Sequence, residues 1–336
     1  MDWSLITENL FAAPILFFAM GVVAGVLRSD LAIPEAVVKL MSLYLMWAIG
    51  IKGGVKLRET GFTTEAVMSL ALAMVLAVVV PVYVYALLRR RLDVDNAAAL
   101  SGVYGSVSAV TFLTATAFLQ RRGIEFGGHM VAALALMESP AILLAVALSR
   151  RSGGGRRRDA RVAAGVPPAA APAPSLASSL REAALNGPVV LLTGCMAIGA
   201  ITGAAGHAML KPLYVDLFPG VLTFFLLELG LVAARRGRVL RVVGAPLLIF
   251  AVIVPLLNAV FGLALARAAG LTEGNAFLLV VLAASASYIA APAAIRHAIP
   301  RASPGLYLPL ALAVTFPFNI TLGLPLYWAL VDWLWK

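Results

Sequence analysis

The stretch Ala283–Pro300, AASASYIAAPAAIRHAIP, decides the predicted fold, because it places polar side chains and a proline inside a run apolar enough to cross a bilayer. Pro292 removes a backbone donor and clashes with the carbonyl four residues earlier. Ser285 and Ser287 carry hydroxyl groups that can satisfy backbone groups left unpaired. Irregular backbone at membrane depth persists only where protein or a water-filled cavity covers it. The stretch therefore predicts a broken helix at an internal site.

A second stretch of this kind, Gly102–Thr116, lies in the first half of the chain and reads GVYGSVSAVTFLTAT. Its middle holds Gly105, Ser106, Ser108 and Thr111. Interrupted spans in corresponding positions of two halves are the sequence pattern typical of a transporter's substrate site. The two stretches together predict one site built from both halves.

The composition is that of an integral membrane protein. Apolar residues make up 62% of the chain, charged residues 12%, and the mean hydropathy is +0.96, whereas soluble domains carry about 25% charged residues. The net charge is +10, but the arginines cluster in loops between apolar runs, where they orient the protein in the membrane. Nucleic-acid binding is therefore not expected.

Ten apolar runs have the length that a bilayer requires, about 17–25 residues each. We predict a first five-helix half over residues 1–149, a flexible linker over residues 150–187, and a second five-helix half over residues 188–336. The linker is basic and rich in Gly, Pro and Ala, a composition that cannot bury a core. The ten runs span residues 11–27, 33–51, 64–88, 96–119, 129–149, 188–209, 213–233, 242–267, 274–296 and 305–331.

The two halves follow the same plan. Ile33–Glu59 begins at a proline, runs apolar to an Ile-Gly pair and ends in basic residues, and Phe218–Arg238 takes the same course. Because each half has an odd number of spans, the second half must be inverted relative to the first. With both termini outside, the inner loops hold roughly twice as many Lys and Arg residues as the outer ones. This orientation places the linker in the cytoplasm.

These residues resemble a divergent member of the SbtA-like sodium-dependent bicarbonate permeases. The resemblance covers nearly the whole chain, through IPEAVVK, IGIKGGVKLRE, GVYGSVSAVT, the Glu138-Ser139-Pro140 step, AASASYIAAP and GLPLYWAL. It implies an all-α membrane protein of ten transmembrane helices in two inverted five-helix repeats, with broken helices four and nine crossing near the midplane. It also implies a homotrimer in the bacterial inner membrane, symport of bicarbonate or another small anion with sodium, and a PII-like regulator at the cytoplasmic face.

The resemblance also implies site residues. Those implicated in substrate binding are Gly105, Ser106, Val107, Ser108, Thr111, Ser285, Ser287, Tyr288 and Ala291. The candidates for ion binding are Ser108, Thr111, Ser287 and Glu138, with no metal beyond a sodium ion. Helix N-termini at such a break carry free N–H groups and a partial positive charge, which suit an anion. Alternatively, the hydroxyl groups bond their own backbone or let helices approach closely.

One departure from the family pattern bears on the driving ion. Tyr288 stands where the family has an aspartate, and a phenol, whose ordinary pKa is about 10, carries no charge at pH 7. A changed substrate or coupling without sodium therefore remains an alternative.

A second alternative concerns the class of protein, because the chain could be a non-transporting membrane sensor or scaffold. An enzyme is not expected. The chain contains neither a phosphate-cradling GxxxxGK[ST] motif nor an HExxH motif. His129, His207 and His297 lack the spacing of a metal site, and Glu228 is a second acidic residue within an apolar run.

Overall fold

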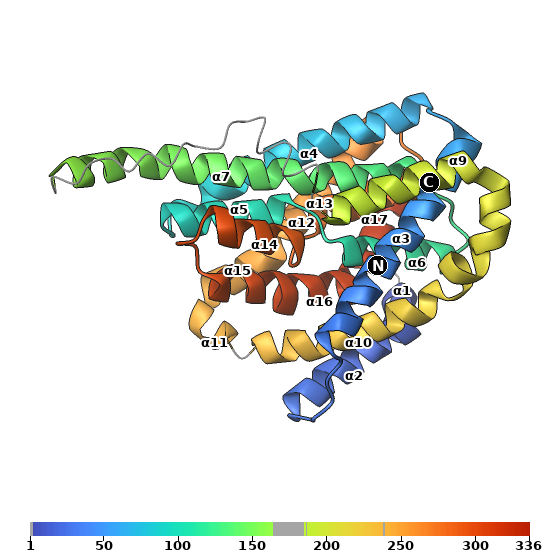
Figure 1. Cartoon of the computed structure of the whole chain (residues 1–336), viewed down its shortest axis with the longest axis horizontal. Coiled ribbons are helices and arrows are strands. Elements are labelled where there is room, and N and C mark those ends of the chain that lie inside the picture. The colour runs from blue at the N-terminus through green and yellow to red at the C-terminus, as the bar shows by residue number, and fades with distance from the viewer. Residues whose placement is uncertain (1–2, 164–184, 186, 238) are drawn as a thin grey trace.

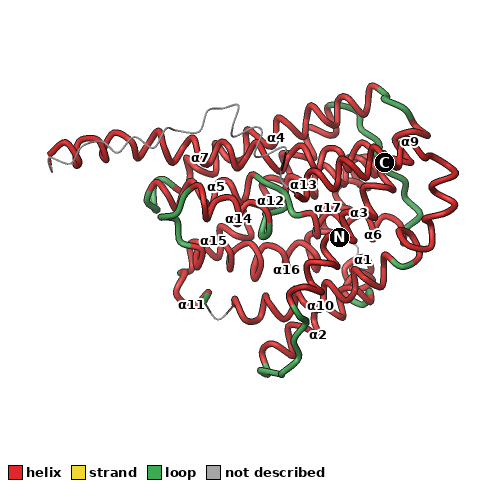
Figure 2. Tube along the Cα trace, viewed as in Figure 1, coloured by secondary structure: helices red, strands yellow, loops and turns green. Residues whose placement is uncertain are grey.

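The computed structural model describes residues 3–163, 185, 187–237 and 239–336, and the described residues form helices joined by loops, without a strand (Figures 1 and 2). The predicted all-α membrane class is confirmed. In the first half the helices are α1 (Trp3–Leu10), α2 (Ala13–Val26), α3 (Glu35–Thr60), α4 (Thr64–Leu88), α5 (Val94–Gly105), α6 (Ala109–Arg121) and α7 (His129–Ala163).

Short polar side chains begin several of these helices. The Thr63 side chain accepts a hydrogen bond from the Ala66 N–H at the start of α4, and Asp93 accepts one from the Asn96 N–H at the start of α5. Such caps satisfy N–H groups that have no acceptor within the helix. The starts of α4 and α5 therefore follow from local sequence.

The second half contains more irregular helices. They are α9 (Gly187–Lys211), the π-helix η1 (Pro212–Asp216), α10 (Phe218–Gly237), α11 (Leu240–Val243), α12 (Ala245–Ala268), α13 (Glu273–Ala284), α14 (Ala290–Ala298), α15 (Pro304–Leu310), η2 (Ala311–Thr315), α16 (Phe316–Phe318), η3 (Asn319–Gly323) and α17 (Leu324–Trp335). Within α9 the backbone kinks at Gly203, whose φ is 54°. The Arg58 guanidinium donates to the carbonyls of Ala200 and Ile201 beside this kink.

Among the described residues, 7 helical segments are long and apolar enough to cross a membrane, or up to 8 if the bent pair α1 and α2 counts as one. This number differs from the ten predicted spans for two structural reasons. The predicted sixth and seventh spans run on through η1 as one helical segment, Val189–Gly237, and the predicted ninth span is divided into α13 and α14. The predicted fourth span is also broken, between α5 and α6.

The first residues of the predicted linker, from residue 150, are helical in the structure. Helix α7 continues through the arginine-rich run to Ala163 and projects from the rest of the molecule (Figure 1). Arginine and alanine both favour helix, which offsets the cost of three adjacent glycines, Gly153 to Gly155. The rest of the predicted linker, residues 164–184 and 186, lies outside the described residues.

The helices form two groups. Helix α2 packs along α10 and α3 along α9, with α10 also touching α3. The second group contains α4, α5, α7, α12 and α13. Large apolar side chains remain exposed on the outer faces of α4 and α12, including Val75, Val79, Ile253 and Leu257, as expected for surfaces that face lipid.

Glycines allow the closest helix contacts in the first group. A Cβ atom on Gly21 of α2 would lie 2.1 Å from the Leu227 carbonyl oxygen of α10. On Gly54 of α3 it would lie 2.0 Å from the Met196 carbonyl oxygen of α9. Such backbone approach is the packing that small residues permit in membranes, where apolar burial between helices supplies little driving force.

We predict that Gly199→Ala weakens the fold, because the added Cβ would lie 2.4 Å from the Ile51 carbonyl oxygen. Overpacking of this kind costs about 1–3 kcal/mol, measurable as a lower midpoint of thermal unfolding in detergent. Gly194→Ala is the matched control on the same helix, because nothing lies within 4 Å of its added Cβ. Equal midpoints for the two variants would contradict the close approach of α3 and α9.

Candidate functional site

The first helix break comprises residues 106–108, between α5 and α6. Ser108 has extended backbone angles and caps α6. Its Oγ accepts hydrogen bonds from the Thr111 N–H at 3.1 Å and from Thr111 Oγ1 at 2.9 Å. Both acceptor positions of Ser108 Oγ are thereby used, which leaves its own hydroxyl proton free to donate to a ligand.

The second break comprises residues 285–289, between α13 and α14. Ser285 Oγ donates to the Leu282 carbonyl at 2.9 Å, which satisfies an acceptor at the end of α13. Ser287 Oγ accepts from the Ala291 N–H at 3.1 Å in the first turn of α14. Ser285 and Ser287 thus satisfy backbone groups at the second break, as Ser108 does at the first.

The two breaks meet inside the protein. The Ser108 N–H donates to Ser285 Oγ at 3.0 Å, and the Ser287 N–H donates to the Val103 carbonyl at 2.9 Å. Each of these four residues is at least 96% buried. The structure therefore brings the two predicted clusters together, with α6 and α14 both beginning at the junction.

Two predicted site residues have clear packing roles. A Cβ on Gly105 would lie 2.6 Å from the Pro81 ring, so only glycine fits against α4 there. Ser106 Oγ donates to the Glu138 carbonyl at 3.2 Å and ties the first break to α7. These contacts hold the break in place.

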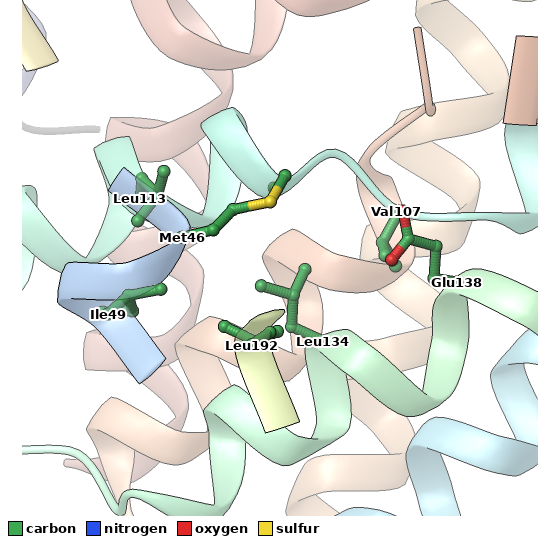
Figure 3. A pocket seen from close by; sticks show the side chains of 8 residues that line it. Met46, Ile49, Val107, Leu113, Leu134, Glu138 and Leu192 are labelled. Carbon is green, nitrogen blue, oxygen red and sulfur yellow. The ribbon is translucent and has the colours of Figure 1, made fainter. Parts of the chain in front are cut away.

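A small cavity adjoins the first break. Val107 and Ala109 line it from the break and from the start of α6, and the Glu138 carboxylate lies beside Val107 (Figure 3). The remaining lining is apolar and comes from α3, α6, α7 and α9, as Met46, Ile49, Leu113, Leu134 and Leu192. Among the described residues, Glu138 is the carboxylate that lines this cavity.

Tyr288 has a buried hydroxyl group without a hydrogen-bond partner among the described residues. Its ring packs edge-on against Phe316, with centroids 5.1 Å apart, and its hydroxyl lies beside the Ser108 side chain without reaching hydrogen-bond geometry. A buried hydroxyl group that lacks a partner is costly. Tyr288 is therefore positioned to bond to a ligand at the junction.

Sequence reasoning missed the residues that support the second break from the last helical segments. Asn319 Nδ2 donates to the Ala284 carbonyl at 2.9 Å, and its Oδ1 accepts from the Tyr327 hydroxyl at 2.8 Å. Asn319 lies where α16 passes into the π-helix η3, and π-helical turns are frequent at functional sites. An asparagine within an apolar run was the available signal.

The donor set at the junction fits an anion better than a cation. It offers hydroxyl protons and the first N–H groups of two helices, where the helix dipole is positive. Hydroxyl and carbonyl oxygens could contact a sodium ion, but a hard cation favours carboxylate ligands, and Tyr288 supplies none. No group of three His, Cys, Asp or Glu residues that could hold a metal ion exists in the described part of the chain.

Comparison with known protein families assigns the chain to a transporter family. Residues 13–332 match the family described as the Na⁺-dependent bicarbonate transporter superfamily, which covers nearly the whole chain. No curated protein sequence matches the chain well enough to count as a relative. The resemblance seen in the sequence motifs is thereby confirmed, and the chain belongs to the Na⁺-dependent bicarbonate transporter superfamily.

Proposed function

We propose that the protein is a secondary transporter that moves bicarbonate or another small anion across the bacterial inner membrane. The observation that carries this proposal is the contact between the two breaks, in which the Ser108 N–H donates to Ser285 Oγ. It joins the N-terminus of α6 to the C-terminal end of α13, from opposite halves of the chain, at one buried point, and α14 begins just beyond it. Such a junction is the usual substrate site of secondary transporters with broken helices.

The chemistry of the junction supports a small, hydrogen-bonding anion. Ser108 and Ser287 accept bonds from helix N–H groups, so their hydroxyl protons point to other acceptors. The Tyr288 hydroxyl adds a third donor. An oxyanion could accept from all three without adding a charged side chain to the site.

We further infer ten spans in two inverted five-helix repeats, with broken helices four and nine crossing near the midplane. Two pairs of matching contacts support this. The packing of α2 on α10 corresponds to that of α9 on α3, and the contact of α6 with α13 corresponds to that of α14 with α5. Movement of one helix group relative to the other would then expose the junction to each side in turn.

The chain is proposed to assemble as a homotrimer, with lipid on its exposed apolar faces. The basic segment from residue 150 is proposed to face the cytoplasm, where a PII-like regulator would meet it. A non-transporting sensor is the competing function, and it would use this segment instead of the helix junction. The mass of the detergent-solubilised complex tests the trimer. A pull-down with a PII-like protein tests the regulator.

The proposed orientation predicts that a cysteine at Ser152 labels only from the cytoplasm and one at Lys336 only from outside. The positive-inside distribution of basic residues is the physical reason. The measurement is labelling of intact cells with an impermeant thiol reagent, repeated after permeabilisation. The native Cys195 is buried and contributes little background. Labelling of Ser152→Cys in intact cells would overturn the orientation.

Ser108→Ala and Ser287→Ala should each weaken the apparent affinity for the transported anion. Loss of one buried hydrogen bond to a charged ligand costs about 1.5–3 kcal/mol, or roughly ten- to a hundred-fold in affinity. Uptake of labelled bicarbonate into proteoliposomes measures the change. Thr116→Val is the control, since Thr116 is buried on α6 and, among the described residues, its hydroxyl bonds only to the Leu113 carbonyl of its own helix. Unchanged affinity in both serine variants would leave the breaks as packing features.

The absence of a carboxylate at Tyr288 favours weak coupling to sodium. A phenol cannot supply the negative charge that offsets a sodium ion's dehydration, so the initial uptake rate should change little with sodium concentration. Tyr288→Phe keeps the ring packed on Phe316 and should lower anion affinity without altering that sodium response. A steep, saturable rise in uptake from near zero with added sodium would show that other oxygen atoms build a sodium site.

A further inference from the structure

Three cavities lie end to end along one face of α3 and one face of α6. The cavity at the first break shares Ile49 with a second cavity, which in turn shares Lys52 and Gln120 with a third. Met46, Ile49, Gly53 and Lys56 line them from α3 at the spacing of a single helix face. The row of cavities therefore runs from the helix junction toward the C-terminal end of α3.

The third cavity is the largest of the three, and two lysine side chains give it positive charge. The Lys52 and Lys56 Nζ atoms lie over the same Phe126 ring, 5.9 and 6.0 Å from its centroid. Lys56 pairs with Glu125 at 2.9 Å, and the Glu125 side chain is 85% exposed. The ring attracts both cations but neutralises neither.

Lys52 differs from its neighbour, because it has no ion pair and no hydrogen bond to any residue that the structure describes. Its side chain is half-buried and lines both the second and the third cavity. A poorly solvated ammonium group without a counter-charge is unfavourable. An anion in the cavity would remove that cost.

We propose that a small monovalent anion binds beside Lys52 in the third cavity before it moves along α3 and α6 to the helix junction. This inference rests on the proposed transport function and extends it to an access site. In the proposed orientation the cavity opens to the outside. Lys56 raises the local concentration of anions at the mouth, and both lysines repel cations there.

The test uses a cysteine in place of Gln120, which is exposed and lines the second and third cavities. In purified protein that also carries Cys195→Ala, it is modified with a negatively charged and with a positively charged methanethiosulfonate reagent. The rate ratio of the anionic to the cationic reagent reports the local charge. Lys52→Gln should lower this ratio by roughly three- to tenfold, whereas Lys52→Arg should preserve it.

Two controls separate a local charge effect from a change in folding. Lys39→Gln removes an exposed lysine from the same helix, about 20 Å along its axis from Lys52, and should leave the ratio unchanged. A cysteine at Phe62, in the exposed loop after α3, should show the same ratio of anionic to cationic reagent rates whether or not Lys52 is replaced. Added bicarbonate should slow the anionic reagent at Gln120→Cys in a saturable way, and Lys52→Gln should abolish that protection.

The reaction requires no transport, so its outcome is distinct from that of the proposed function. An unaltered ratio in Lys52→Gln, or protection by bicarbonate that survives this change, would overturn the access site even if the protein transports anions. A lowered ratio with lost protection would support the site even if proteoliposomes show no uptake. If Lys52→Arg lowered the rate ratio as much as Lys52→Gln does, the positive charge of Lys52 would not be what attracts the anion.

Discussion

The structure depends on the need to pair backbone polar groups that two broken helices leave free inside a membrane. Each break satisfies some of its own backbone groups through its serines, but not all of them. The Ser108 N–H reaches Ser285 Oγ and the Ser287 N–H reaches the Val103 carbonyl, so each break completes the other. Because an unpaired backbone group in a membrane interior costs several kcal/mol, this one constraint accounts for the contact between the two breaks and for the position of the candidate site.

Close glycine packing supplies the frame around this junction. Gly21 and Gly54 let α2 and α3 approach the backbones of α10 and α9, so these helices form one closely packed group. The cavity beside the first break lies where this group meets α6 and α7, since Met46 and Leu192 line it opposite Leu134. The candidate site and the proposed access path thus lie at the boundary between two helix groups, where relative movement would open and close them.

The charged and polar groups at this boundary bear on which kind of ion it would bind. Lys52 lines the second and third cavities and has no ion pair with any described residue, hydroxyl and N–H donors gather at the junction, and Glu138 is the carboxylate beside the break. Tyr288 contributes a donor where a carboxylate would favour a cation. Apart from Glu138, these features favour an anion, and any cation binding would depend on Glu138 and on oxygens other than those of Tyr288.

The sequence by itself determined the membrane class, the family and the location of both breaks, because apolar length, Pro292 and the serine clusters act locally. It did not predict that α7 continues past residue 150 to Ala163. The ten predicted spans also differ in number from the 7 or 8 apolar segments among the described residues. Only the tertiary structure decided that Ser108 meets Ser285, that Asn319 supports Ala284 and that Lys52 lines a row of cavities. These contacts join residues far apart in the chain. They depend on which helices pack together, and no local sequence pattern predicts that.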